Sequence, residues 1–235
     1  MAKETVKAIK NSEAGLVAYS EPKSAAAEAY RTLRTNITFA NPDKPVHTLL
    51  VTSTSPDDGK STTIANLAIT FAASGSPTVL VDADLRRPHL HTIFGLSNET
   101  GLTTLVADMA RTRDGSVPKV PLQSTQIENL QLLTSGPVPP NPAEILGSQR
   151  MTELLALLRS NAEYVLIDTP PVIAVTDAAV LAPKVDGVLI VINAGKTRRD
   201  LAIKARDILM QVNANILGVV LNNAEIDKSS YAYYG

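Results

Sequence analysis

Leu49-Leu50-Val51-Thr52 leads directly into Ser53-Thr54-Ser55-Pro56-Asp57-Asp58-Gly59-Lys60-Ser61-Thr62, and a helical apolar pattern follows. The stretch matches the Walker A pattern Gly-x-x-x-x-Gly-Lys-Ser/Thr, except that Thr54 stands at the first glycine. An apolar strand before such a loop and a helix after it form the context in which backbone N–H groups bind phosphate oxygens. The stretch therefore predicts a nucleotide-binding α/β fold built on a strand, a phosphate loop and a helix.

The residues of the loop have separate expected roles. Lys60 is expected to reach the β- and γ-phosphates of a nucleotide, and the Ser61 hydroxyl is expected to bind Mg²⁺. An ordinary strand–helix turn is the alternative, against which the strand before the loop and the helix after it both argue. The predicted nucleotide-binding residues of this segment are Pro56, Asp57, Asp58, Gly59, Lys60, Ser61 and Thr62.

Three aspartates follow two other buried strands. Asp82 and Asp84 follow the apolar run Val79–Val81, and Asp168 follows Tyr164–Ile167. Because ligands of an open α/β sheet bind at the carboxyl ends of the strands, we expect the three carboxylates to converge on the phosphate loop. Carboxylates suit Mg²⁺, which is a hard cation. For any single aspartate, a helix cap or a turn is the alternative.

Short apolar runs alternate with helical patterns along the rest of the chain. Runs without polar alternation are typical of parallel strands that are covered on both faces. The sequence therefore predicts an α/β fold with a doubly wound, mostly parallel sheet flanked by helices, of the P-loop NTPase type. The expected elements are strands over Thr48–Thr52, Thr78–Val81, Leu130–Thr134, Tyr164–Ile167, Gly187–Ile192 and Ile216–Leu221, a helix over Ala25–Phe39, and an irregular excursion over 110–129.

Length and composition limit the function classes. The 235 residues predict a mobile arm over 1–24, a single domain over 25–228 and a tail over 229–235. A hydrophobic share of 44% excludes a disordered chain, and a net charge of −1 gives no argument for a nucleic-acid partner. Because the chain has no cysteine, disulfides and thiolate chemistry are excluded. No apolar run approaches the ~20 residues of a membrane helix, so we expect the chain not to cross a membrane by itself.

Four segments together resemble the bacterial tyrosine kinases (BY-kinases) of capsular and exopolysaccharide synthesis, in their cytoplasmic catalytic domain. The resemblance runs from about Glu21 to the C-terminus, and it implies the P-loop fold of the partition and septum-site ATPases. The four segments are the phosphate loop, Val81-Asp82-Ala83-Asp84-Leu85-Arg86-Arg87-Pro88, Ser135-Gly136-Pro137-Val138-Pro139-Pro140-Asn141-Pro142-Ala143-Glu144-Ile145-Leu146, and Asp168-Thr169-Pro170-Pro171.

The resemblance implies ATP and Mg²⁺ and gives roles to the site residues. Lys60 and Ser61 become the Walker A pair, Asp82 and Asp84 the Walker A′ carboxylates, and Asp168 the Walker B carboxylate. We expect Asp82 to be the base that takes the tyrosine proton, with Ser61, Asp84 and Asp168 at Mg²⁺. Spacing leaves the roles of Asp82 and Asp84 exchangeable.

Further residues are expected to surround this centre. Asn222 ends the last strand, and its amide can read both a donor and an acceptor on a base edge. The resemblance to related ATPases implies that this base is adenine. Arg86 and Arg87 either clamp the incoming substrate or form a solvated pair at a helix start.

Two segments bear on assembly and on the phosphoacceptor. The motif Glu28, Arg31 and Arg34 resembles the E-x-x-R-x-x-R motif through which these kinases form rings, and an ordinary charged helix face is the alternative. The cluster of Tyr231, Tyr233 and Tyr234 resembles the family's C-terminal phosphoacceptors; here the alternative is an aromatic tail packed on its own domain.

The predicted function is that of an ATP-dependent protein-tyrosine autokinase, which phosphorylates its C-terminal tyrosines in trans and regulates polysaccharide synthesis or export. We expect it in the cytoplasm, bound to the membrane through a separate transmembrane activator, with other protein substrates also open. One rival is a partition-type ATPase that acts as a nucleotide-gated scaffold. Such proteins carry an extra lysine early in the loop, where this chain has Ser55, and lack the tyrosine tail. A catalytically idle regulator is a second rival, which the presence of Lys60 and the three aspartates disfavours.

Overall fold

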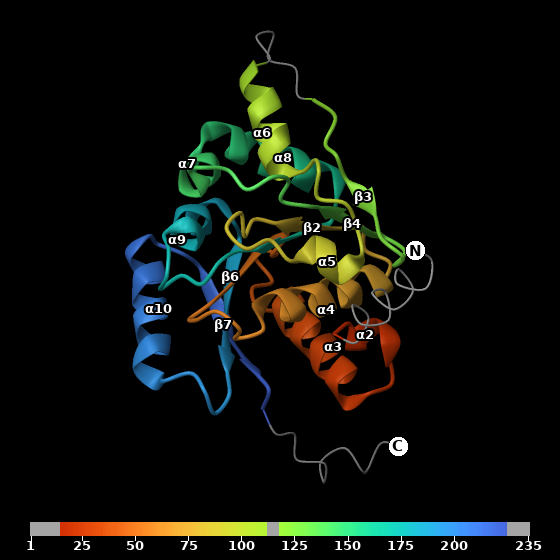
Figure 1. Cartoon of the computed structure of the whole chain (residues 1–235). Helices are drawn as coiled ribbons and strands as arrows, with labels where there is room; N and C mark the ends of the chain where they lie inside the picture. Colours follow the sequence, from red (N-terminus) through yellow and green to blue (C-terminus); the bar gives the residue numbers. More distant parts are fainter. Residues whose placement is uncertain (1–14, 112–117, 225–235) are drawn as a thin grey trace, which may run out of the picture.

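A seven-stranded sheet forms the centre of the molecule in the computed structural model, which describes residues 15–111 and 118–224 (Figure 1). The strand order is β3-β4-β2-β5-β1-β6-β7, and every pair is parallel except β3 with β4. The strands are β1 (Thr48–Ser53), β2 (Thr78–Asp82), β3 (Gln123–Ser124), β4 (Leu130–Leu133), β5 (Tyr164–Asp168), β6 (Gly187–Asn193) and β7 (Ile216–Asn222). The predicted doubly wound α/β fold is confirmed.

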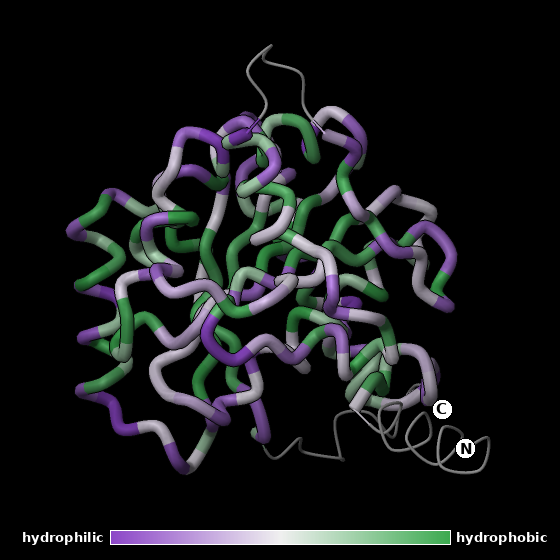
Figure 2. The backbone as a smooth tube through the Cα atoms, turned by 45° about the horizontal axis from the view of Figure 1, so that its top comes forward, coloured by the Kyte–Doolittle hydropathy of each residue, from purple (hydrophilic) through white to green (hydrophobic). Residues whose placement is uncertain are grey.

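Helices cover both faces of the sheet and divide the core into two apolar clusters. One cluster joins the sheet to α2, α3, α4 and α5, and the other joins it to α6 through α10. Figure 2 shows the apolar segments in the interior and the hydrophilic ones mainly at the outer turns. The helices are α2 (Val17–Ser20), α3 (Ala25–Thr38), α4 (Lys60–Ala73), α5 (Leu90–Phe94), α6 (Leu102–Arg111), α7 (Pro142–Gly147), α8 (Gln149–Asn161), α9 (Asp177–Leu181), the 3₁₀ turn η1 (Ala182–Lys184) and α10 (Arg199–Gln211).

The position of β1 decides where a ligand can bind. All six residues of β1 are buried, and the strand lies between β5 and β6. From β1 the chain crosses over β5 to β2, whereas from β5 it crosses over β1 to β6. The strand connections therefore run in opposite directions around β1, and such a switch point leaves a crevice at the carboxyl ends of the strands. The phosphate loop begins there.

The folded domain begins earlier in the chain than the sequence predicts. Leu16 is fully buried, and the side chain of Asn66 on α4 accepts a hydrogen bond from the Ala18 N–H (2.9 Å) and donates one to the Gly15 carbonyl (2.8 Å). The prediction of a mobile arm up to residue 24 is therefore wrong for residues 15–24. The anchor is a side chain 48 positions away, which no local pattern reveals.

Some predicted segments also differ or lie outside the described residues. The excursion over 110–129 contains strand β3, whose two residues are too few to produce a strand pattern. Residues 1–14 of the predicted arm and the predicted tail over 229–235 lie outside the described ranges. None of the helices within 15–111 and 118–224 is both long and apolar enough to span a bilayer.

Candidate active site

The phosphate loop joins β1 to the N-terminus of α4. Gly59 precedes the helix with φ of 88°, and no side chain caps the first turn. The first N–H groups of a helix lack partners within the helix, and the helix dipole makes this end attractive to anions. The positive φ favours glycine, and a Cβ at position 59 would also collide with the Asn222 side-chain amide, which would have to move. The loop therefore offers an anion site of the kind that the motif predicts.

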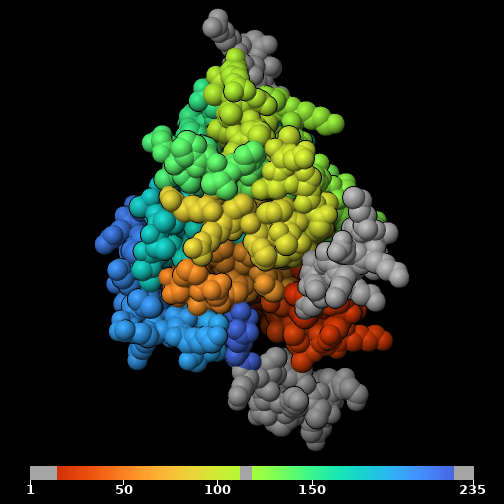
Figure 3. All heavy atoms as spheres, viewed as in Figure 1, coloured from red at the N-terminus to blue at the C-terminus, as the bar shows by residue number. Residues whose placement is uncertain are grey.

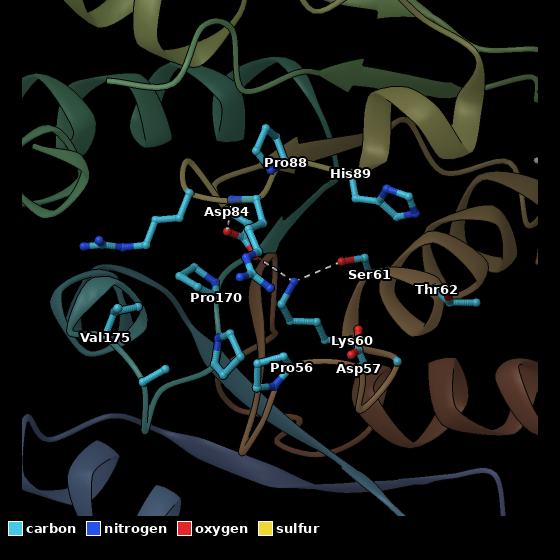
Figure 4. Close-up of a pocket in the computed structure, with 15 residues that line it drawn as sticks. Pro56, Asp57, Lys60, Ser61, Thr62, Asp84, Pro88, His89, Pro170 and Val175 are labelled. Atoms are coloured by element: carbon cyan, nitrogen blue, oxygen red, sulfur yellow. Dashed lines mark hydrogen bonds and ion pairs between the residues drawn. The ribbon is translucent and has the colours of Figure 1, made fainter. Parts of the chain in front are cut away.

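Lys60 turns from this loop toward the carboxyl ends of β2 and β5. Its ammonium lies 2.9 Å from Asp84 Oδ2 and 3.7 Å from Asp168 Oδ1, and it donates to Ser61 Oγ at 3.0 Å (Figure 4). Burial by itself would lower the pKa of Lys60, but the Asp168 and Asp84 carboxylates outweigh it and raise that pKa. Lys60 is therefore a firmly charged group in a negative environment.

Asp82 lies below the surface of the site. It has no exposed area, and its carboxylate accepts hydrogen bonds from the N–H groups of Asp84 (3.2 Å), His89 (3.1 Å) and Leu90 (3.0 Å). Burial, and then the neighbouring Asp168 carboxylate, raise the pKa of Asp82 to about 8. A carboxyl group of this kind exchanges its proton near neutral pH.

Asp168 pairs in register with Asp82 in the sheet and is fully buried. Neither of its carboxylate oxygens accepts a hydrogen bond in the described part of the chain, Oδ1 has the Lys60 ammonium at 3.7 Å, and burial raises the pKa of Asp168. Buried carboxylate oxygens without hydrogen bonds are costly unless a cation binds them closely. With Asp84 and the Ser61 hydroxyl nearby, the oxygen donors fit Mg²⁺, which binds to one or two carboxylates and completes its shell with phosphates and water. Within residues 15–111 and 118–224, no three acidic, histidine or cysteine side chains are arranged so that they could hold a metal ion among them.

A cavity of about 740 Å³ opens above Lys60. Figure 3 shows the phosphate-loop segment, in orange, at the molecular surface between the yellow and blue segments. Asp84 borders this cavity, whereas Asp82 and Asp168 do not. The lining residues are Pro56, Asp57, Gly59, Lys60, Ser61, Thr62, Asp84, Arg86, Arg87, Pro88, His89, Pro170, Pro171, Ala174 and Val175.

The side chains of two residues predicted to contact the nucleotide, Asp58 and Asn222, form hydrogen bonds to the protein. Asp58 is buried and does not border the cavity, because its carboxylate turns toward Thr54 and Ser55. Asn222 lies against the loop and donates its amide N–H to the Asp58 carbonyl at 3.0 Å. The carbonyl oxygen of that amide has no hydrogen bond within the described residues, so the predicted contact with adenine stays a prediction.

Arg86 has a partner that the sequence did not reveal. Its guanidinium donates two hydrogen bonds of 2.9 Å to Asp177, a fully buried residue in the first turn of α9. Neither interpretation of Arg86, as a substrate clamp or as half of a solvated pair, describes this contact. Arg87 is exposed and borders the cavity, and its guanidinium has no hydrogen bond or ion pair within the described ranges. Arg86 therefore has a structural role, whereas the Arg87 guanidinium is available to a ligand in the cavity.

The predicted interface motif lies on α3, away from the cavity. Glu28 and Arg31 form an exposed ion pair at 2.6 Å, and Arg31 also donates to the Pro22 carbonyl at 2.8 Å. Arg34 donates to the Thr70 carbonyl near the end of α4 at 2.7 Å. Arg34 therefore joins two helices of one chain, whereas the Glu28–Arg31 pair faces outward.

The sequence relatives identify the family. The ParA family model, described as NUBPL iron-transfer P-loop NTPase, matches residues 45–231. Tyrosine-protein kinase YwqD of Bacillus subtilis is 42% identical over 221 residues, which cover 94% of this chain and 91% of that protein. The chain belongs to the bacterial tyrosine kinases.

Solved structures of such kinases have the same fold. The crystal structure of the chimerical protein CapA2B2 superposes with a TM-score of 0.83 at 40% identity and covers 91% of both chains. The kinase domain of Escherichia coli tyrosine kinase ETK gives a TM-score of 0.79 at 33% identity, covering 90% of this chain and 82% of that one. The ParA family model alone does not separate these kinases from partition ATPases. The kinase relatives do, and they make the partition-type alternative the weaker interpretation.

Replacing Arg86 by Ala is expected to destabilise the protein by about 2–3 kcal/mol, because it leaves the buried Asp177 carboxylate without its partner. This lies below the about 3–5 kcal/mol usual for breaking a buried ion pair, since the Arg86 side chain is 39% exposed. Urea unfolding provides the measurement, and Arg87→Ala is the matched control, expected within about 0.5 kcal/mol of wild type. Equal effects of the two substitutions would contradict the structural role of Arg86.

Replacing Asp168 by Asn is expected to stabilise the ligand-free protein at neutral pH. Because burial raises the pKa of Asp168, folding favours its protonated form. Wild type then loses stability as the pH rises above the ordinary carboxyl value of 3.8. The variant loses less over the same range, because only Asp82 keeps a raised pKa there and the Asp168 charge no longer adds to it. We expect a Tm gain of about 2–4 °C at pH 7.5, roughly 1 kcal/mol for a chain of this size, that shrinks toward pH 4. A difference in Tm that is independent of pH would refute the argument.

Proposed function

We propose that this chain is an ATP-dependent protein-tyrosine autokinase that requires Mg²⁺. The observation that carries the proposal is the convergence of Lys60 and three carboxylates at the strand ends beside an uncapped helix N-terminus. Phosphoryl transfer asks a protein mainly to position the reacting oxygens and to neutralise charge, and these groups suit both tasks. The 42% identity to a tyrosine-protein kinase supports the choice of a tyrosine acceptor.

The loop residues 56–62 bind the phosphates in this proposal. With ATP bound, the Lys60 ammonium moves from the carboxylates to the β- and γ-phosphates. A cation then neutralises the carboxylates in its place. Mg²⁺, when bound, supplies neutralisation of the phosphate oxygens. Ser61, Asp84 and Asp168 would hold it, and the Asp168 oxygens, which accept no hydrogen bond within the described residues, support this set. Asn222 binds the adenine through the face of its amide that is not on the loop.

The proton of the acceptor tyrosine needs a base, because the phenol has an ordinary pKa near 10. Asp82 is the first candidate, and its pKa of about 8 supports proton exchange near neutral pH. Asp84 is the exchanged assignment, and its place on the cavity wall supports it, since Asp82 has no exposed area. In this assignment Asp82 holds the loop that carries Asp84 in place, through the hydrogen bonds that it accepts from backbone N–H groups.

The proposed acceptors are Tyr231, Tyr233 and Tyr234, which lie outside the described residues and form the proposed tail 229–235. From Asn222, at the end of β7, nine residues to Tyr231 span at most about 30 Å. This reach suffices for a neighbouring subunit, and transfer in trans avoids a tight reversal beside the strand end. Phosphorylation adds about −1.5 to −2 charges per tyrosine, which repels the tail from a site with three carboxylates.

Assembly and partners complete the proposal. A ring-shaped homo-oligomer forms through α3, with the outward Glu28–Arg31 pair exchanging partners across the interface. The kinase acts in the cytoplasm at the inner face of the membrane, bound to a separate transmembrane activator. It regulates capsular or exopolysaccharide synthesis, other proteins are further substrates, and no nucleic acid takes part.

Mixing two defective proteins tests transfer between subunits. Lys60→Met with an intact tail receives phosphate only from another chain, because it lacks the charge that neutralises the phosphates. The donor carries Phe at positions 231, 233 and 234. With Mg-ATP, phosphopeptide mapping is expected to find phosphate on the tail of the Lys60→Met chain.

Each protein alone is the control and is expected to stay unlabelled on the tail. Circular dichroism must show that Lys60→Met is folded. Tail labelling of Lys60→Met alone would refute the site, and its absence in a mixture shown to co-assemble would refute transfer in trans.

The interface proposal predicts that Glu28, Arg31 and Arg34 replaced together by Ala give monomers or small species in light scattering. Because Arg34 also bonds to α4, the double variant Glu28→Ala/Arg31→Ala separates assembly from folding. Its exposed ion pair contributes at most about 1 kcal/mol to stability, so the mass is expected to fall while the Tm stays nearly unchanged.

The exposed pair Arg206–Asp207 on α10 provides the matched control. Arg206→Ala/Asp207→Ala is expected to keep the oligomeric mass of wild type. An unchanged mass in the α3 variants would exclude this helix as the interface.

A further inference from the structure

Asp58 makes three hydrogen bonds inside the phosphate loop and beyond it. Its Oδ2 accepts from the Thr54 hydroxyl (2.6 Å) and from the Ser55 N–H (2.8 Å). Its Oδ1 accepts from the hydroxyl of Thr197, in the segment between β6 and α10, at 3.1 Å. The residue is only 5% exposed. The carboxylate therefore stabilises the conformation of the loop from within and faces away from the cavity.

Two distant segments join the same hydrogen-bond network. The Thr197 hydroxyl also accepts from the Asn193 N–H (2.9 Å), so both of its hydrogen-bonding functions are used. Asn222 donates its side-chain N–H to the Asp58 backbone carbonyl (3.0 Å), and the backbone carbonyl of Asn222 accepts the Ala194 N–H (2.8 Å). In Figure 3 the orange loop segment adjoins the blue segments of β6–α10 and β7. We call Thr54, Asp58, Thr197 and Asn222 the Asp58 clamp.

The clamp explains the departure of this loop from the Walker A pattern. Thr54 stands at the first glycine, is 2% exposed and carries a hydroxyl that needs a partner when buried. Asp58, four residues later, provides that partner. The loop also holds Asp57 at φ of 63°, a conformation that a side chain rarely adopts and that surrounding contacts must maintain. Hydrogen bonds thus fix a backbone shape in which this loop uses fewer glycines than the motif.

A carboxylate beside a phosphate site has two opposing effects. Its charge repels the phosphates. Its hydrogen bonds hold the loop in one conformation, so that less conformational entropy of the loop is lost when the nucleotide binds. Three donors, two of them hydroxyl groups and one a backbone N–H, face the Asp58 charge and reduce the repulsion. The geometry therefore favours the ordering effect.

We propose that Asp58 is a positioning residue of the phosphate loop. Its hydrogen bonds to Thr54 within the loop and to Thr197 outside the loop hold the loop in the conformation that binds ATP. This inference rests on the proposed use of the loop as an ATP site. It also assigns Thr197 and Asn222 as the contacts through which the β6–α10 segment and β7 support the loop.

The test measures KM for ATP and kcat in the full chain with Mg-ATP, together with nucleotide affinity by calorimetry. For Asp58→Ala we expect KM and the dissociation constant to rise about 10-fold or more, with kcat within about 3-fold. Thr197→Val should weaken binding about 3- to 10-fold, and Thr197→Ser should restore most of that loss because it keeps the hydroxyl. The double variant Asp58→Ala/Thr197→Val should bind nucleotide no more weakly than Asp58→Ala, since the Asp58–Thr197 hydrogen bond is already lost in the single variant.

The matched control is Asp200→Ala, which removes an exposed carboxylate paired with Arg198 at the start of α10. Its KM is expected within about 2-fold of wild type. If Asp58→Ala does not fold, Thr197→Val and its serine counterpart decide the question, because Thr197 lies outside the loop. Wild-type or tighter nucleotide binding by folded Asp58→Ala overturns the inference, as does equal loss in the valine and serine variants. Failure of the wild type to bind Mg-ATP overturns the proposed function itself, and the inference with it.

Discussion

Three aspartate carboxylates lie at the carboxyl ends of two neighbouring strands, and a single ammonium, that of Lys60, contacts two of them. Burial raises the pKa of Asp82 to about 8 and that of Asp168 as well, so this cluster destabilises the ligand-free fold near neutral pH. A protein that retains such a cost does so at a functional site. Here the excess negative charge suits a cation and the phosphates that accompany it.

The sheet is arranged so that this charge cluster faces an anion site. β1 carries the phosphate loop, and its neighbour β5 and the next strand β2 carry the aspartates. The helix N-terminus at Lys60 attracts anions, whereas the strand ends attract cations. The two regions meet in one cavity, which is the electrostatic pattern that a metal-bound nucleotide requires.

Contacts between distant segments hold the loops of this cavity. The Arg86–Asp177 pair joins the segment after β2 to α9, and the Asp58 clamp joins the phosphate loop to β6–α10 and β7. Both contacts place a carboxylate in the interior, where its partners determine whether it stabilises the fold. The loops that bind ligand are in this way attached to the rigid part of the molecule, which limits the reordering that binding requires.

The sequence by itself determined the fold class, the strands, the phosphate loop and the three aspartates at the strand ends, because each of these depends on a contiguous pattern. Apolar runs predict buried parallel strands, and Gly59-Lys60-Ser61 after a strand predicts an anion site. Only the tertiary structure decided that Leu16 belongs to the core, that Arg86 meets Asp177 91 positions away, and that Asp58 meets Thr197 139 positions away. Such partners depend on which strands are neighbours in the sheet and where their loops emerge. Local periodicity carries no information about that order, because it reports only which side of an element is buried.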